Sequence, residues 1–481
     1  MRMSSNMRAR YGLVVVAIGV LVGLSANVPR ALAEPDFAIP PPLKPQVDFW
    51  VSIFAVYGKR QVVIHDTERL DRIYSVLDLS DLDQEGLTDM QIELTMKEQE
   101  DIEKARIRGL LRRLDQVDLR SEPLTPEEQR LVALFASDPS PGKFAAAAAE
   151  DRVRGQRGLR ERFAHGLQIA HAYFPSMERI FVQEGVPPEI TRLPMVESCF
   201  DVHAYSKLGA AGVWQFMPAT ARNYMRVDGV VDQRLDPIIA TRAAAKFMRK
   251  NYEMLGTWPL AIKAYNHGPA GIARAIRETG TTDVATIIEN YHGPAYKFAS
   301  RNFYPEFLAA LYVEGNYRKY FGDLLLDPPL NAEAIQLPQE TSITAAARCA
   351  GTDTWELASL NPSLLASVHA GQQPIPAGYE LRVPRGTGER FQTCVASLPQ
   401  MRMAAVPSAR AYRRMTAGTR RAGTARGRPV HTLHIVHKVK QGQTLEQIAG
   451  LYGCSVEQIR RGNKIKGNKI HAGQLLRIPV S

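Results

Sequence analysis

Cysteine is scarce in this chain, with four residues in 481, and this scarcity limits the chemistry that the sequence can support. No spacing of cysteine and histidine matches a zinc site, so we expect neither a metal centre nor a cofactor. Cys199 lies in a helical segment and is expected to be a small buried residue rather than a reactive thiol. Cys349 and Cys394 flank one small segment, and the sequence leaves open whether they pair or stay reduced.

The N-terminal region lacks a hydrophobic run of the length that crosses a membrane. A span usually needs about 20 apolar residues, and the run at 11–24 is shorter. Arginines precede this run and small residues at 31–33 follow it, so residues 1–33 are predicted to be a secretory signal peptide, with an uncleaved anchor as the alternative. Because no cysteine lies near the cleavage site, a lipid anchor is not expected. We therefore expect export to the periplasm or cell envelope.

Acidic residues are absent from an arginine-rich stretch near the C-terminus. The chain has a net charge of +11. Much of it comes from Arg402, Arg410, Arg413, Arg414, Arg420, Arg421, Arg426 and Arg428. The Ala, Gly, Thr and Pro content of this region offers little apolar surface to bury, so residues 395–433 are predicted to form a basic flexible linker. In an exported protein we expect weak contact with anionic envelope polymers, and we do not expect nucleic acid as a partner.

The length of the chain indicates roughly three or four structural units. Residues 34–157 are predicted to be helical and irregular, and residues 158–325 to form a helix-rich domain. Asp236-Pro237 begins one of its helices, because an Asp N-cap followed by proline is a strong helix start. The predicted fold class is α+β and mostly helical.

Two segments near the C-terminus share a pattern. Residues 338–386 contain Asn361 and residues 436–481 contain Asn463. Each segment closes with Ala-Gly-x-x-Leu-Arg, an apolar residue and proline. The shared pattern predicts one unit used twice, in which two short helices lie between two strands.

Glu197 is the most informative single residue. At helical spacing, Ile190, Leu193 and Glu197 fall on one stripe, so the carboxyl is carried on an apolar face. Burial disfavours the charged form, and we therefore expect a raised pKa and an acid that stays protonated near neutral pH. Ser206 and the Gly-rich phrase 209–218 follow, and small residues there let the backbone approach a ligand.

These residues carry a family resemblance. Val196-Glu197-Ser198, Ser206, the phrase 209–218 and the later phrase 264–269 resemble the family 1 lytic transglycosylases, most closely the membrane-bound lytic murein transglycosylase D group. Residues 437–480 resemble LysM domains, and 340–385 resemble a degenerate copy. The resemblance implies a lysozyme-like catalytic domain with small βααβ LysM modules. It also implies cleavage of the MurNAc–GlcNAc β-1,4 bond of peptidoglycan to form 1,6-anhydro-MurNAc ends, with glycan strands as the partner of the LysM module.

Site roles follow from the same resemblance. Glu197 matches the catalytic acid of the family. The residues implied to lie along the substrate are Ser206, Gln215, Phe216, Tyr265, Asn266, Phe303 and Tyr304. Three positions depart from the family pattern: His267 stands where a small residue is common, Phe303 replaces a frequent tyrosine, and Ala299 replaces a frequent glutamate. Phe303 keeps a ring that can stack on a sugar but loses a hydrogen-bond donor.

Two other functions remain open at this stage. One is a hydrolytic muramidase on the same scaffold, against which the absence of an evident second carboxylate argues. The other is a non-catalytic scaffold that binds the cell wall. Ser206 and Gln215 would then be turn and capping residues, and Tyr265 a half-buried core residue.

Overall fold

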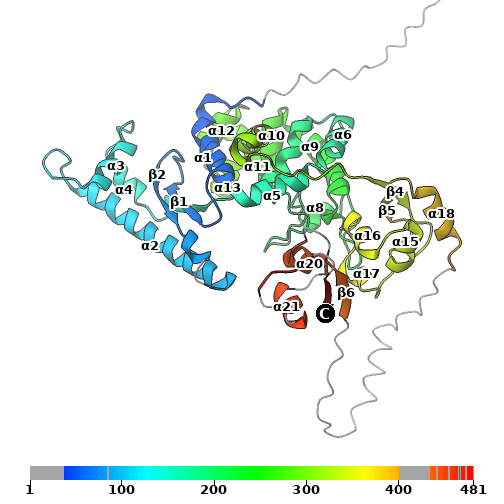
Figure 1. The fold of residues 1–481 in the computed structure, drawn as a ribbon. Helices are drawn as coiled ribbons and strands as arrows, with labels where there is room; N and C mark the ends of the chain where they lie inside the picture. The colour runs from blue at the N-terminus through cyan, green and yellow to red at the C-terminus, as the bar shows by residue number, and fades with distance from the viewer. Residues whose placement is uncertain are drawn as a thin grey trace, which may run out of the picture. The chain divides into compact units, whose positions relative to one another are not determined.

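The computed structural model describes residues 37–83, 86–399 and, with short gaps, 434–479. The predicted signal peptide at 1–33 and most of the predicted linker at 395–433 lie outside these ranges. Helices dominate the described chain and strands form three small sheets, so the prediction of a mostly helical α+β fold is confirmed (Figure 1). None of the described helices combines the length and the apolar character that crossing a bilayer requires.

The first part of the chain contains a small sheet and its own core. Its elements are η1 (Pro41–Leu43), α1 (Lys44–Ala55), β1 (Gln61–Asp66), β2 (Ile73–Asp78), η2 (Ser80–Asp83), α2 (Asp89–Gln116), α3 (Pro126–Leu134), α4 (Lys143–Ala147) and β3 (Val153–Arg157). The three strands are antiparallel in the order β2-β1-β3. One stripe of α2, which includes Met96, Ile107 and Leu111, is buried among residues of the sheet and of α3 and α4. By contrast, α1 is part of the larger core formed by the helices that follow.

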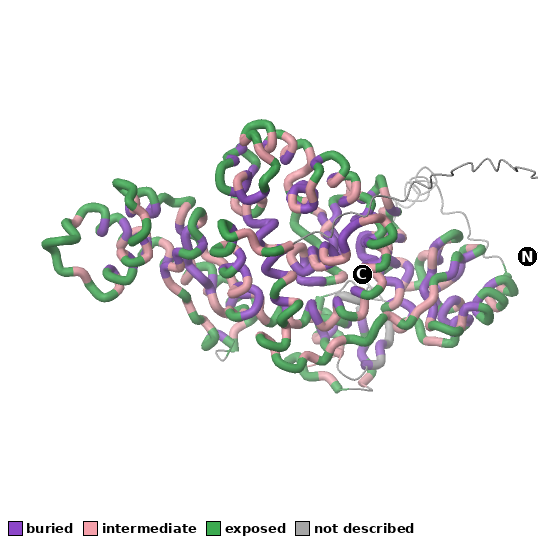
Figure 2. The backbone as a smooth tube through the Cα atoms, turned by 90° about the horizontal axis from the view of Figure 1, so that it is seen from above, coloured by how far each residue is buried: buried purple, intermediate pink, exposed green. Residues whose placement is uncertain are grey.

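The helical domain follows β3. Its elements are α5 (Arg160–Ala170), α6 (Phe174–Gln183), η3 (Pro188–Arg192), α7 (Leu193–Glu197), α8 (Pro218–Ala221), η4 (Gln233–Leu235), α9 (Pro237–Leu255), α10 (Trp258–His267), α11 (Pro269–Thr279), α12 (Val284–Asn290), α13 (Phe298–Gly315) and α14 (Tyr317–Phe321). Helix α9 begins at the cap that the sequence predicts: Asp236 accepts hydrogen bonds from the N–H groups of Ile238 and Ile239, and Pro237 is the first helical residue. Buried positions recur along these helices as stripes facing one common core (Figure 2).

Both predicted repeats have short helices between two strands, but the first strand of each begins before the predicted bound, at 332 instead of 338 and at 434 instead of 436. The first contains β4 (Ala332–Gln336), α15 (Ile343–Ala350), α16 (Thr354–Leu360), α17 (Ala366–His369), β5 (Glu380–Pro384) and α18 (Gly388–Ala396). The second contains β6 (His434–Lys438), α20 (Leu445–Tyr452), α21 (Val456–Asn463) and β7 (Leu475–Pro479). In each repeat the strands form an antiparallel pair. The first repeat adds α17 and α18 to the predicted unit.

The shared asparagine has the same role in both repeats. Asn361 accepts a hydrogen bond from the backbone N–H of Arg382 at 2.8 Å and donates one to the carbonyl of Arg382 at 2.7 Å. Asn463 does the same with the backbone of Arg477, with both distances 2.6 Å. Each asparagine therefore ties the second helix of its unit to the closing strand.

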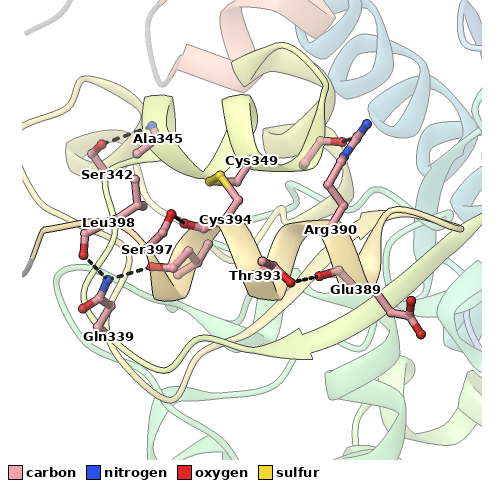
Figure 3. Close-up of a disulfide and its surroundings, with 12 residues drawn as sticks. Gln339, Ser342, Ala345, Cys349, Glu389, Arg390, Thr393, Cys394, Ser397 and Leu398 are labelled. Carbon is pink, nitrogen blue, oxygen red and sulfur yellow. Dashed lines mark hydrogen bonds between the residues drawn. A yellow bond between two sulfur atoms is a disulfide. The ribbon is translucent and has the colours of Figure 1, made fainter.

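A disulfide joins Cys349 on α15 to Cys394 on α18 in the first repeat (Figure 3). Of the two alternatives that the sequence leaves open, the structure has the pair bonded. Gln339 also holds the end of α18, because its Nε2 donates to the carbonyls of Val395 and Leu398. Cys199 is a buried free thiol, as predicted.

The first repeat is continuous with the loop that precedes α9. Val231 of this loop is fully buried in the hydrophobic core of the repeat. The backbone N–H of Asp232 donates to the carbonyl of Ser363 at 2.8 Å, and the N–H of Leu365 donates to the carbonyl of Val230 at 3.0 Å. The loop at 228–236 thus lies within the helical domain along the sequence, but it packs against the first repeat.

Candidate active site

Glu197 is the last residue of α7, and its side chain is half-buried. Its carboxyl makes no hydrogen bond or ion pair with the described residues. Burial, followed by the negative charge of Glu306 on α13, raises the pKa of Glu197 to about 8. The raised pKa predicted from the helical spacing is therefore confirmed, and the acid stays protonated at neutral pH.

The backbone at the end of α7 is fixed on both sides. Ser198 Oγ donates to the carbonyl of Pro194 and, at 3.1 Å, to the carbonyl of Val213, so the end of α7 is tied to the Gly-rich phrase 209–218. On the other side, a side-chain carbon at Gly166 would lie 2.0 Å from the carbonyl oxygen of Cys199. Only glycine allows α5 to approach this closely.

The phrase 209–218 forms a compact loop that depends on unusual backbone angles. Gly212 has φ 73°, and a side-chain carbon there would lie 1.8 Å from the carbonyl oxygen of Arg234. Gln215 also has a positive φ, 48°, although it is not glycine. Its Nε2 donates to the carbonyl of Gly212 at 2.9 Å. A strained backbone of this kind persists where the surrounding structure holds it, and such positions gather at functional sites.

The guanidinium group of Arg234 stabilises this loop. Its Nη1 donates to the carbonyls of Gly209, at 2.7 Å, and Phe216, at 3.0 Å. Its Nη2 pairs with Asp232 at 2.7 Å, and both side chains are buried. The loop beside Glu197 is therefore attached to the segment that packs into the first repeat.

Trp214 and Phe216 point into the core. The Trp214 ring is fully buried, stacks on Phe181 and donates through Nε1 to Thr241 Oγ1 at 2.9 Å. Phe216 is 3% exposed and packs against Phe247 and Tyr265. The structure thus places Phe216 under the loop, where it supports the backbone instead of presenting its ring to a ligand.

Ser206 is exposed and lies in the turn that begins the loop. Its Oγ accepts a hydrogen bond from the N–H of Ala210 at 2.9 Å, and its own N–H donates to the carbonyl of Ala210. The hydroxyl keeps a proton that it can donate to a ligand.

Tyr265 and Asn266 lie at the end of α10, near Glu197. Tyr265 Oη donates to the carbonyl of Trp214 at 2.8 Å. Burial, with the charge of Glu197 as the second cause, holds the pKa of Tyr265 well above its usual range. Asn266 is exposed, and its Oδ1 accepts a hydrogen bond from Ser300 Oγ at 3.0 Å. Tyr265 thus joins α10 to the loop, while Asn266 faces solvent.

Phe303 and Tyr304 on α13 are buried, 4% and 1% exposed, and lie in the main hydrophobic core. Neither ring presents a surface on which a sugar could stack. Ala299, one turn earlier, is exposed. The departures from the family pattern at positions 299 and 303 therefore leave this part of α13 without the polar groups that the family carries there.

Glu306 is a second carboxyl beside Glu197 that the sequence analysis missed. It lies on α13, one turn beyond Phe303, and is half-buried without a hydrogen bond or ion pair to the described residues. Burial raises the pKa of Glu306 to about 8, against the charges of Lys263 and Arg154, which lower it. The argument that no second carboxylate accompanies Glu197 is thus wrong. The helical spacing of Ala299, Phe303 and Glu306 was the available signal.

Lys263 is the cation that lowers the pKa of Glu306 most. It is 1% exposed, and its Nζ donates to the carbonyl of Ser300 at 2.7 Å. Burial, and then the charge of Arg301, hold its pKa well below the usual range. Within the described residues no group of three or more His, Cys, Asp and Glu side chains is placed to hold a metal ion.

Comparison with known families agrees with this geometry. Residues 181–288 match the family model described as "Transglycosylase SLT domain", and residues 437–479 match the "LysM domain" model. The first match contains Glu197, the loop 209–218 and the Tyr265-Asn266 pair. The chain therefore contains an SLT domain and a LysM domain.

Curated relatives extend the similarity beyond these domains. The chain is 28% identical over 335 residues to the membrane-bound lytic murein transglycosylase D of Escherichia coli strain K12, covering 68% of this chain and 69% of that protein. A putative tributyltin chloride resistance protein of Alteromonas sp. strain M-1 is 38% identical over 96 residues, which is 20% of this chain and 46% of that protein. The solved lytic transglycosylase Slt of Pseudomonas aeruginosa is 19% identical, with a TM-score of 0.28 over 42% of this chain and 31% of that chain. This chain thus spans about two thirds of the Escherichia coli relative and under a third of Slt.

Proposed function

We propose that this lytic transglycosylase uses Glu197 as its only proton-transfer residue to cleave the MurNAc–GlcNAc β-1,4 bond of peptidoglycan and to form 1,6-anhydro-MurNAc ends. The observation that carries the proposal is a half-buried carboxyl next to the loop 209–218 that has no hydrogen-bond or ion-pair partner among the described residues and whose pKa is raised to about 8. A carboxyl in this state carries a proton at neutral pH and can act as a general acid.

The reaction needs two proton transfers, and one carboxyl can perform both. The protonated Glu197 gives its proton to the glycosidic oxygen, and the bond from that oxygen to C1 of MurNAc breaks. The N-acetyl oxygen of the substrate supports the electron-poor C1, as in substrate-assisted glycosidases. The Glu197 carboxylate then takes the proton of the C6 hydroxyl while O6 bonds to C1, so the ring closes without water.

The surroundings of Glu197 favour the second transfer as well as the first. After the first transfer the carboxylate is half-buried, and no cation among the described residues pairs with it. Desolvation destabilises that charged state. Recovery of a proton from the C6 hydroxyl relieves this cost, which makes the same environment suit an acid and, in the next step, a base.

Substrate contacts are proposed for the polar residues that reach the surface around Glu197. Ser206 and Asn266 are exposed, and Gln215 is partly buried on the strained loop. Tyr265 is proposed to fix the loop relative to Glu197 through its bond to the Trp214 carbonyl. Phe216, Phe303 and Tyr304 are proposed to support the cleft from within, because each is nearly inaccessible.

The LysM domain is proposed to hold the enzyme on the glycan, and the cell envelope is the proposed place of action. The Escherichia coli relatives are named membrane-bound murein transglycosylases, which supports an envelope location. A bound module raises the local concentration of a tethered catalytic domain at the wall. The basic segment that contains 402–428 adds attraction to anionic envelope polymers.

Muropeptide analysis of digested sacculi tests the reaction. We expect anhydro ends from the wild-type chain and none from Glu197→Gln, which keeps the shape of the side chain and removes its proton. Glu289→Gln, at an exposed position on α12, is the matched control and should retain activity. Reducing ends in place of anhydro ends would refute the transglycosylase reaction.

A hydrolytic muramidase remains the second candidate, because Glu306 supplies the second carboxyl that such a mechanism uses. Digestion in ¹⁸O-labelled water separates the two reactions. Hydrolysis places the label in the new reducing end, whereas ring closure incorporates no solvent oxygen.

A further inference from the structure

We propose that a cationic pocket at the start of α13 binds a carboxylate of the peptide stem that peptidoglycan carries on its muramic acid residues. The pocket has a volume of about 660 Å³. Its walls come from β3, α2 and the connection between α12 and α13, and include Arg152, Arg154, Tyr296, Lys297, Phe298 and Arg301. This inference rests on the proposed function and names a further part of its substrate.

The pocket contains cations that form no ion pair within the part of the chain that the structure describes. Its other basic residues are paired: Arg152 with Asp66 and Glu68, and Lys97 and Lys104 with acids of α2. Arg154, Lys297 and Arg301 form no ion pair with any described residue. Arg154 lies over the Phe298 ring at 4.4 Å, and Arg301 Nη2 lies 3.3 Å from His292 Nδ1. The acids of the pocket that form no ion pair with a described residue are Glu150 and Asp151, and both are exposed.

Two buried polar atoms of the pocket lack partners. Tyr296 is 2% exposed, and its Oη has no hydrogen-bond partner among the described residues. Arg301 Nε is likewise buried and unpartnered. A buried polar group without a partner costs about 1–3 kcal/mol. Both residues line the pocket, so a small shift of either side chain toward a bound hydrogen-bond acceptor would recover that cost. Burial raises the pKa of Tyr296, which keeps its hydroxyl protonated and able to donate.

The N-terminus of α13 adds the partial positive charge of a helix end to the unpaired cations of the pocket. This helix has 18 residues, begins at Phe298 and has no side-chain cap, since its N-cap residue is Lys297. The free N–H groups of a first turn carry a partial positive charge, and an anion is a favourable partner for them. Tyr296, Lys297 and the first helical residue, Phe298, all line the pocket, so a carboxylate bound there would lie close to this helix end.

The same turn of α13 forms a wall of the proposed cleft. Ser300 Oγ donates to Asn266 Oδ1 at 3.0 Å and lies 3.1 Å from His267 Nδ1. The Tyr296 ring packs edge-on against His267, with centroids 5.1 Å apart. Ser300, which contacts Asn266, therefore lies on the same helical turn as Phe298 and Arg301, which line the pocket. In peptidoglycan with intact stems the lactyl carboxyl is consumed in an amide bond, so the free carboxylates belong to the stem.

Paired substrates test the proposal. Sacculi with intact stems are compared with sacculi whose stems have been removed by an amidase, using the full chain and the variants Lys297→Gln and Tyr296→Phe. We expect kcat/KM on intact sacculi to fall about tenfold in Lys297→Gln, as for the loss of one charge-assisted bond, and to change less than about twofold on stripped sacculi. Lys250→Gln, at an exposed position on α9, is the control and should match the wild type on both.

The outcomes separate the pocket from the reaction. An equal fall on both substrates, or no fall on either, would overturn the proposal. If the wild type forms no anhydro ends from either substrate, the proposed function fails, and a binding experiment then tests the pocket.

In the binding experiment, calorimetry measures the affinity of the free stem tetrapeptide for the full-length Glu197→Gln chain, with inorganic phosphate as competitor. We expect binding that Lys297→Gln weakens about tenfold and that phosphate weakens by competition; phosphate binding without peptide binding would refute the stem as ligand.

Discussion

Arg382 of the first repeat and Asp236 of the helical domain form a buried ion pair. Arg382 Nη2 lies 2.8 Å from Asp236 Oδ1, and Nη1 contacts the other carboxylate oxygen. The two residues are 5% and 0% exposed. The same carboxylate accepts the N–H groups of Ile238 and Ile239 at the start of α9. A single aspartate therefore both begins α9 and holds the closing strand of the repeat.

Breaking this pair should destabilise the helical domain as well as the repeat. Removing one partner of a buried pair typically costs about 3–5 kcal/mol, because the other charge stays buried and unpaired. We expect Arg382→Met to lower the melting temperature clearly in thermal unfolding. Arg242→Met is the matched control: it breaks the exposed pair between Arg242 and Glu380 across the same contact, which is worth about 0–1 kcal/mol. Equal effects of the two variants would contradict the prediction.

The pH dependence of activity should report the coupling between Glu197 and Glu306. The acid form of Glu197 is needed first, so activity should decline as pH rises through about 8. Glu306→Gln removes a negative charge that raises the pKa of Glu197, so the alkaline decline should move to lower pH. Profiles of kcat/KM for this variant and for Glu289→Gln provide the measurement, and an unmoved alkaline limb in Glu306→Gln would contradict it.

Stability should depend on Glu197 in a defined pH window. Its pKa rises from 4.5 to about 8 on folding, so below pH 4.5 both states are protonated. As pH rises toward 8, the unfolded chain loses this proton while the folded chain keeps it, and the folded state loses stability. Glu197→Gln should therefore melt at a higher temperature than the wild type at pH 8 and at the same temperature at pH 4. A difference of equal size at both values would mean that titration is not the cause.

The Gly-rich loop should not tolerate a side chain at Gly212. Alanine there would have to adopt a left-handed φ and would place a carbon 1.8 Å from the Arg234 carbonyl oxygen. The backbone angle alone costs about 1–2 kcal/mol, and the clash adds to it. We expect Gly212→Ala to lose most activity. Gly229→Ala, where no atom lies within 4 Å of the new carbon, should retain it.

Deletion of residues 436–481 should separate wall binding from turnover. We expect the fraction of protein that sediments with purified sacculi to fall strongly, while the rate of cleavage of a short soluble glycan changes little. Equal loss in the two assays would show that the second repeat supports the catalytic domain structurally.

Local patterns in the sequence predicted the parts of the site that depend on neighbours along the chain. The spacing of Ile190 and Leu193 placed Glu197 on an apolar face, and its raised pKa follows. The repeated asparagine predicted the βααβ units, and both asparagines make the same backbone bonds.

Features that depend on distant contacts were not predictable in this way. Phe303 and Tyr304 have rings that suit either a sugar platform or a core, and only the packing of α13 decides for the core. Helical spacing places Glu306 on the same face of α13 as Phe303, but nothing local shows that this face meets Glu197, which is more than 100 residues away in sequence. The pair of Arg382 and Asp236 joins two units that the sequence treats as separate.

The disulfide between Cys349 and Cys394 determines how a mechanical load would enter the enzyme. A C-terminal module gripping the wall while the cell grows would pull on the chain beyond residue 399. Because Cys394 on α18 is bonded covalently to α15, that pull would pass into the body of the first repeat instead of peeling α18 away. From the repeat, the Arg382–Asp236 ion pair would transmit the force to the start of α9. Because Thr241 of α9 accepts a hydrogen bond from Trp214, the force would then reach the loop 209–218 next to Glu197.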